Sequence, residues 1–190
     1  MWRWSRFRLL PVRTDIRTLI EDIYKSLARK SAFHDCMSRI TAVTHTDLHA
    51  NHPDILVDFA SMCARLSKLP NSSQEARLAL RDHVSTVTLM LDLASLTGQQ
   101  LARLLWASAT VSVKPIIPAS FAHEFPVHAL SEKDLCNALW GLSKFASSSE
   151  PEILTLFSRM IDALDDARLE KFSNEDLVAI LRSASNVYSR

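Results

Sequence analysis

The chain has 190 residues, of which 47% are hydrophobic and only two are glycine. This length suffices for one medium-sized domain or a short array of repeats, and the scarcity of glycine disfavours sheet-rich folds and glycine-rich phosphate-binding loops. The formal net charge of +1 hides an asymmetry, because residues 1–30 carry +5 and the remaining residues carry −4. No apolar run approaches the roughly 18 residues that cross a bilayer, so we expect no transmembrane segment.

Residues 1–14 form a basic head with two tryptophans and no acidic residue. Its four arginines are Arg3, Arg6, Arg8 and Arg13. Arginine-rich, acid-free amphipathic starts are typical of mitochondrial transit peptides, because a positive helix is attracted to anionic membranes and import receptors. We therefore predict a targeting segment and a mitochondrial matrix location, with the plastid as the alternative. The other interpretation of the head is a retained basic arm that contacts nucleic acid or a protein partner.

Residues 15–190 are predicted to form one α-helical repeat domain. Helix-start signals recur at Asp15, Asn51, Thr97, Ser131 and Ser173. In the clearest copies, "SEKDLCNALWGLSKF" (131–145) and "SNEDLVAILRSASNVY" (173–188), a serine precedes an aspartate by three residues and leucines follow on one face. A capping hydroxyl accepts a bond from an unpaired N–H of the first turn, and an acidic side chain suits the positive end of the helix.

Second helices are predicted between these starts. They are "SAFHDCMSRITAV" (31–43), "SSQEARLALRDHVSTVTLMLDL" (72–93), in which a break is possible, and "PEILTLFSRMIDAL" (151–164), where Pro151 suits a first helical turn. The segment 111–130 contains three prolines, so it is predicted to hold only a short or irregular helix.

Paired helices with a period of about 40 residues predict an all-α fold, an α-solenoid of four to five helical hairpins. An irregular helical bundle is the alternative, because the copies are loosely spaced. In the last unit the first helix has no second helix to follow it. Its apolar residues Leu177, Ile180 and Leu181 are therefore expected to need a partner or a missing segment of the chain.

Three fragments, "SEKDLCNALWGLSKF", "TGQQLARLLWASA" and "FSNEDLVAILRSASNVY", carry a family resemblance over residues 50–190. They resemble the repeats of organellar helical-repeat proteins of the octotricopeptide and heptatricopeptide type, which are associated with RAP domains and are similar in style to FAST-kinase-like proteins. The resemblance implies a mitochondrial or plastid protein that acts on organellar RNA, including ribosomal RNA, or serves as a ribosomal subunit. Two features depart from the family: no RAP-like sequence is present, and the body is not basic.

The predicted function is that of a non-enzymatic helical-repeat subunit of an organellar ribonucleoprotein, a mitochondrial ribosome or an RNA-processing assembly, that binds RNA and other protein subunits. The alternative is a protein–protein scaffold of a mitochondrial membrane or respiratory complex with no RNA role. RNA binding needs basic residues that neutralise phosphates. The candidates are Arg3, Arg6, Arg8, Arg13, Arg103, Lys144 and Arg182. A wider stripe on the body adds Arg65, Lys68 and Lys114, with Asn137, Asn186 and Ser143 as hydrogen-bonding groups.

We expect no catalytic residue, metal, cofactor or small-molecule substrate. His45, His49 and His52 lack the glutamate of a zinc-binding H-E-x-x-H helix, so the stretch is predicted to be a polar loop, with a zinc site as the alternative. The widely spaced cysteines, Cys36, Cys63 and Cys136, indicate reduced and buried thiols.

Two further groups are given structural roles. The acidic run "DALDDARLE" (162–170) is predicted to be a solvated helix end rather than a pair of catalytic carboxylates. Trp106 and Trp140 are predicted to be core, although indoles at these positions could also stack on bases.

Overall fold

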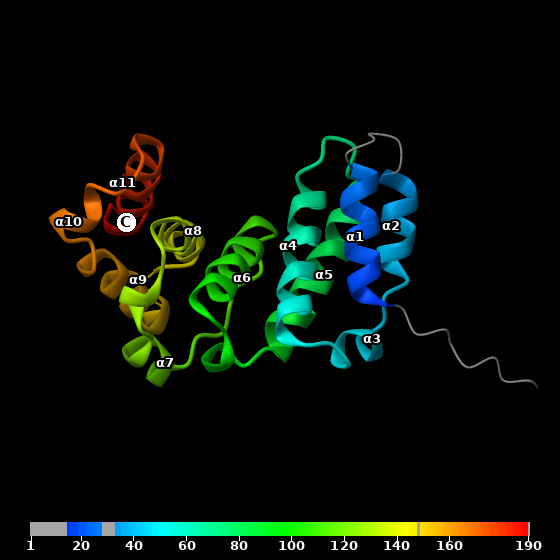
Figure 1. Cartoon of the computed structure of the whole chain (residues 1–190), viewed down its shortest axis with the longest axis horizontal. Helices are drawn as coiled ribbons and strands as arrows, with labels where there is room; N and C mark the ends of the chain where they lie inside the picture. The colour runs from blue at the N-terminus through cyan, green and yellow to red at the C-terminus, as the bar shows by residue number, and fades with distance from the viewer. Residues whose placement is uncertain (1–14, 28–32, 148, 190) are drawn as a thin grey trace, which may run out of the picture. The chain divides into compact units, whose positions relative to one another are not determined.

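The computed structural model describes residues 15–27, 33–147 and 149–189. Every regular element in these ranges is a helix, which confirms the predicted all-α class (Figure 1). The helices group into two compact units, divided after Asn51. The basic head, with Arg3, Arg6, Arg8 and Arg13, lies outside the described residues. The prediction that residues 15–190 form a single repeat domain stays a prediction.

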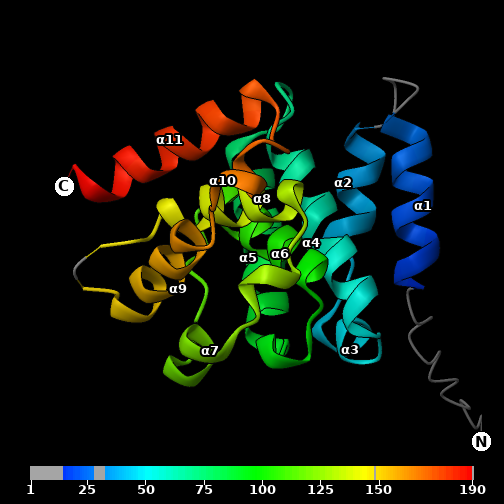
Figure 2. The same cartoon turned by 60° about the vertical axis from the view of Figure 1, so that its left-hand side comes forward.

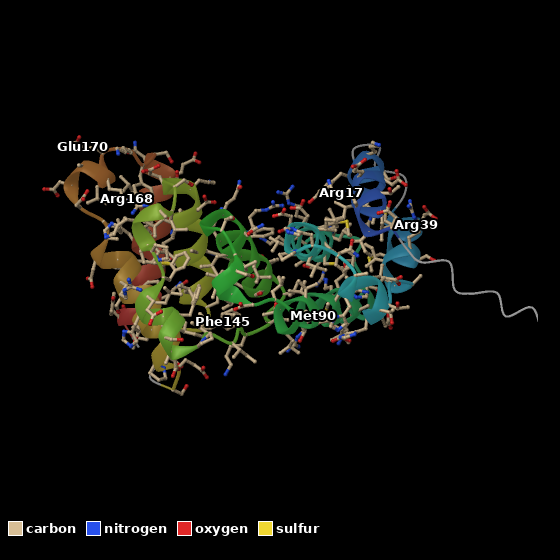
Figure 3. All side chains as sticks on the ribbon, turned by 60° about the horizontal axis from the view of Figure 1, so that its bottom comes forward. Arg17, Arg39, Met90, Phe145, Arg168 and Glu170 are labelled. Carbon is tan, nitrogen blue, oxygen red and sulfur yellow. The ribbon has the colours of Figure 1, made fainter. Side chains whose placement is uncertain are left out.

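The first unit contains a helix pair, α1 (Ile16–Leu27) and α2 (Phe33–Thr41), whose faces pack together. The predicted start and the predicted second helix are both found here. Asp15 accepts bonds from the backbone N–H groups of the first turn of α1. Arg39 of α2, labelled in Figure 3, donates to Asp22 of α1 at 2.9 Å.

A third helix in this unit, α3 (His45–His49), corrects the prediction of a polar loop. Thr44 and Asp47 form a reciprocal capping box, in which the Thr44 hydroxyl accepts from the Asp47 N–H and the Asp47 carboxylate accepts from the Thr44 N–H. The capping box satisfies two donors at once, and Leu48 is buried. These interactions stabilise a single helical turn where polar residues alone suggested a loop.

In the second unit, four long helices follow one another as neighbours (Figure 1). They are α4 (Pro53–Ser67), α6 (Gly98–Thr110), α8 (Glu132–Ser143) and α11 (Asn174–Tyr188). We call this succession the helix row. Helix α4 contacts α6, α6 contacts α8, and α8 contacts α11.

The caps of these helices confirm three predicted starts and correct a fourth. The hydroxyls of Thr97, Ser131 and Ser173 each accept from the N–H three residues further on. The cap of α4 is His52 rather than Asn51. Proline has no N–H and a fixed φ, so Pro53 takes the first helical position and the cap falls on the residue before it.

The remaining longer helices of this unit are α5 (Gln74–Met90), α7 (Ala119–Glu124) and α9 (Pro151–Asp162) (Figure 2). Helix α5 contacts α4 and α6 and runs without the break that was considered possible. Helix α9 contacts α8 and α7, and Pro151 occupies its first turn as predicted. The proline-rich segment holds only α7 and a single turn, η2 (Val127–Ala129), as expected.

Two short turns complete the second unit. The turn η1 (Leu93–Ser95) precedes α6, and α10 (Asp166–Leu169) links α9 to α11. Arg168 of α10, labelled in Figure 3, donates to the carbonyl oxygen of Leu130. The predicted solvated acidic run is confirmed, because Asp162, Asp165 and Asp166 are exposed.

Helix α11 buries only part of its apolar face. Ile180 is 5% exposed, whereas Leu181 is 68% exposed and Val178 is 45% exposed.

Across the described ranges, no helix is both long enough and apolar enough to cross a membrane.

The approach of α6 to α8 depends on a glycine. Gly141 is buried in the last turn of α8. A Cβ atom added there would lie 2.8 Å from both the carbonyl carbon and the carbonyl oxygen of Leu105 in α6. Because those atoms belong to the backbone, no side chain could move away to make room. The two helices therefore pack at a separation that any larger residue at position 141 would prevent.

We predict that Gly141→Ala destabilises the second unit. Overpacking costs about 1–3 kcal/mol, more than the roughly 1 kcal/mol that alanine gains over glycine inside a helix. Chemical denaturation followed by circular dichroism measures the difference.

The matched control is Gly98→Ala. Its added Cβ would meet the flexible side-chain end of Leu130 at 2.8 Å, so we expect stability within about 0.5 kcal/mol of the parent. Equal stability of the Gly141→Ala variant and the parent would contradict the close approach of α6 and α8.

Candidate functional site

Equivalent positions of α4, α6 and α8 contribute to one surface. Counted from each N-cap, the sixth, ninth and thirteenth residues recur at spacings that place them on one side of a helix. The sixth residues are Asp58, Arg103 and Asn137; the ninth are Ser61, Trp106 and Trp140; the thirteenth are Arg65, Thr110 and Lys144. Because the three helices are neighbours, this register aligns side chains that lie far apart in the sequence.

Lysines cover the two indoles on this surface. The Nζ of Lys68 lies 4.9 Å from the ring centroid of Trp106 and 5.6 Å from that of Trp140. The Nζ of Lys144 lies 5.2 Å from the Trp140 centroid. Each such contact stabilises by about 0.5–1 kcal/mol at an exposed site. We call Lys68, Trp106, Trp140 and Lys144 the lysine–tryptophan cluster.

Both indoles are only partly buried, which corrects their prediction as core residues. The leucines beside them are the core residues: Leu105 is 1% exposed and Leu139 is 0% exposed. Adjacent residues in a helix point about 100° apart, so a leucine can face the neighbouring helix while the following tryptophan lies at the edge. The indoles therefore keep part of their surface available to a ligand.

Beside Trp106, a pocket of about 240 Å³ opens between α4, α6 and α8. Its lining residues are Ser61, Arg65, Arg103, Trp106, Lys133 and Asn137. We call it the helix-row pocket. Two of its cations have carboxylate partners: Arg103 pairs with Asp58, and Lys133 pairs with Asp176 at 3.4 Å. The hydroxyl oxygen of Ser61 is buried and has no hydrogen-bond partner.

The structure brings some of the predicted RNA-binding residues together and separates others. Arg103 lines the helix-row pocket, and Lys144 belongs to the lysine–tryptophan cluster. Arg182 is exposed on α11, further along the helix row. Lys114 lies in the segment between α6 and α7, where it pairs with Glu150 at 2.6 Å.

Two polar residues show what sequence reasoning missed. Ser143 is 1% exposed and donates to the carbonyl oxygen of Trp140 at 2.9 Å, so it is not a hydrogen-bonding group for a ligand. Lys133 lines the pocket, although it was not among the predicted residues. Its position four residues before Asn137 is the available signal, because residues four apart share one face of a helix.

The thiols are not arranged for catalysis. Burial raises the pKa of the Cys63 thiol strongly, and burial followed by the nearby Asp176 carboxylate raises the pKa of Cys136 to about 11. Both thiols are therefore protonated at neutral pH, and a protonated thiol is a poor nucleophile. All three cysteines are buried and free, as predicted.

The histidines of the first unit are close together without a third ligand. The ring centroids of His45 and His49 lie 4.3 Å apart in an edge-on arrangement. Within the described part of the chain, no group of three or more histidine, cysteine, aspartate or glutamate side chains could hold a metal ion. A structural or catalytic zinc ion takes three or four protein ligands.

Comparisons with known proteins found no matching family model, no matching curated protein and no matching solved structure. The resemblance to octotricopeptide and heptatricopeptide repeats therefore stays a prediction, as do the organellar location and the ribonucleoprotein role.

We predict that Cys136 makes stability depend on pH above its ordinary thiol pKa of 9.0. The folded-state pKa is raised, so the native state binds more protons than the unfolded state as the pH rises, and stability falls through this range. Between about pH 8 and about pH 10.5, the parent should lose about 1–2 kcal/mol more than Cys136→Ala does. Denaturant unfolding under reducing conditions measures both proteins, and equal losses would contradict the prediction.

Proposed function

We propose that the second unit is a run of helical-hairpin repeats in which α4, α6, α8 and α11 are the first helices. Three observations support this proposal: the caps recur, the helices contact one another in succession, and equivalent positions carry related side chains. Helix α5 and helix α9 are the second helices of their hairpins, and α7 is a shortened one. In such arrays a repeat buries its apolar face only against its neighbours.

We further propose that the aligned faces of α4, α6 and α8 bind single-stranded RNA. The observation that carries this proposal is the lysine–tryptophan cluster, in which two partly buried indoles lie on neighbouring helices under lysine side chains. Single-stranded nucleic acids are bound by aromatic side chains that stack on successive bases, at about 1–3 kcal/mol per base, and by cations that follow the backbone. The lysines would leave the ring faces for phosphates as bases take their place.

The local charge supports an anionic ligand although the body of the chain is mildly acidic. The cluster and the helix-row pocket together present Arg65, Lys68, Arg103, Lys133 and Lys144. Two carboxylates, Asp58 and Asp176, pair with members of this set. Basic residues concentrated on one surface are the electrostatic feature that nucleic acids recognise.

The cellular role follows from the head and the repeats together. An arginine-rich, acid-free start supports import into mitochondria, and the leucine–tryptophan helices support membership of an organellar ribonucleoprotein. In this role the chain is a non-enzymatic subunit that contacts RNA through the aligned faces of α4, α6 and α8. The mitochondrial ribosome and an RNA-processing assembly are the particles that fit.

A protein-binding scaffold is the second candidate, and a separate observation favours it. Leu181 and Val178 leave apolar surface exposed on α11. Two of the cations that line the helix-row pocket, Arg103 and Lys133, already have carboxylate partners within the chain. A scaffold would use α11 to pack against another subunit without contacting RNA.

Binding of a fluorescein-labelled oligouridine, followed by fluorescence anisotropy, tests the RNA proposal. We expect the full chain to bind, and Trp106→Ala/Trp140→Ala to bind at least about tenfold more weakly, because each lost stacking contact costs about 1–3 kcal/mol. The Lys68→Gln/Lys144→Gln variant keeps both indoles and should also bind more weakly, with a weaker dependence on salt.

The matched aromatic control is Tyr188→Ala, because Tyr188 is 60% exposed on α11, outside the cluster. It should bind as the parent does, and circular dichroism should show that each variant is folded. Absence of binding by the full chain would contradict the RNA proposal, as would affinities that none of the substitutions in the cluster changes.

A further inference from the structure

A second groove lies where α4 and α6 end and α5 begins. It has a volume of about 270 Å³. Four of its lining residues, Gln74, Arg77, Leu78 and Arg81, come from α5 at spacings of three, four and seven residues from the first. These spacings place them on one face of the helix. We call this site the α5 groove.

No carboxylate forms an ion pair with the cations of the α5 groove, within the residues that the structure describes. Lys68, Arg77 and Arg81 line the groove, and no acidic side chain does. The helix-row pocket differs in this respect, because carboxylates partner two of its cations. Three like charges repel one another, so an anion placed among them would be held favourably.

Hydroxyl groups line the opposite wall of the groove, at the end of α6. The hydroxyl oxygen of Thr110 is buried without a hydrogen-bond partner. Ser112 has a φ of 59°, and the N–H of the next residue, Val113, donates to the carbonyl oxygen of Ser108 at 2.8 Å. This pattern ends α6 in a turn that usually contains glycine. A serine there places a second hydroxyl group at the groove.

Helix ends alone do not account for this arrangement. The carbonyl groups at the end of a helix attract cations, which explains the presence of Lys68 at the end of α4. Arg77 is in the first turn of α5, where the helix end carries a partial positive charge, and Arg81 lies one turn further on. Arg77 therefore adds positive charge where the helix itself disfavours it.

We propose that the α5 groove binds one phosphate of the backbone of single-stranded RNA. This inference rests on the RNA-binding function proposed above and assigns its phosphate contact. The guanidinium groups of Arg77 and Arg81 can each donate two parallel bonds to phosphate oxygens. Leu78, which is 50% exposed, offers apolar contact to the adjoining sugar.

Lys68 connects this site to the lysine–tryptophan cluster. Its side chain lines the α5 groove, and its Nζ lies 4.9 Å from the Trp106 ring centroid. A phosphate in the groove is therefore next to a base that stacks on Trp106. The strand would run from the α5 groove across Trp106 to Trp140, with the helix-row pocket to one side of Trp106.

The test compares Arg77→Ala/Arg81→Ala with a control that removes the same charge elsewhere, Lys114→Ala/Lys171→Ala. Oligouridine affinity is measured by anisotropy over a range of salt concentrations. We expect the arginine variant to bind about tenfold more weakly and its slope of log affinity against log salt to be smaller by about 0.7, the value for one lost phosphate contact of a single strand. The control should keep the slope of the parent. Arg77→Lys/Arg81→Lys keeps the charge and should recover most of the slope.

The outcomes separate this inference from the proposed function. If oligouridine binding depends on Trp106 and Trp140 but the arginine variant keeps the affinity and slope of the parent, the phosphate site is wrong and RNA binding stands. If the parent binds no oligouridine, both proposals fail. If inorganic phosphate stabilises the parent but not the arginine variant, while both bind oligouridine equally, the groove holds free phosphate and the assignment to RNA is overturned.

Discussion

The close packing of α6 against α8 at Gly141 is the constraint on which the surface of the second unit depends. The backbone of Leu105 occupies the space that a side chain at position 141 would need. Trp106 follows Leu105, and Trp140 precedes Gly141, so each indole is one residue from the point of closest approach. The packing that buries the leucines therefore also brings both tryptophans within reach of Lys68. The contact between α6 and α8 thus forms part of the core and also positions the candidate binding surface.

Much of the fold could be predicted because its signals are local. A serine or threonine before a helix binds an N–H only two or three residues away, so Thr97, Ser131 and Ser173 are identifiable as caps from the sequence. The errors arose where two local rules competed. Pro53 shifted a helix start by one residue, and the capping box of Thr44 turned an expected loop into a helical turn.

The candidate site was less predictable because it depends on contacts between helices. Leu105 and Trp106 are both apolar, and the spacing of apolar residues does not show which of the two faces the next helix. Arg77 and Arg81 were not predicted, because the predicted basic stripe contained only residues on or near the first helices and both arginines belong to a second helix. The α5 groove forms where the ends of α4 and α6 meet the start of α5. The spacing of residues within one helix does not show how the ends of different helices are placed.

Ultraviolet crosslinking of the full chain to a short oligoribonucleotide, followed by mass spectrometry of the crosslinked peptides, tests whether the aligned faces of α4, α6 and α8 form one RNA-binding surface. We expect crosslinks at Trp106 and Trp140, the two aromatic side chains under Lys68. Crosslinks confined to α9 or α11, or no crosslink to the second unit, would contradict this expectation.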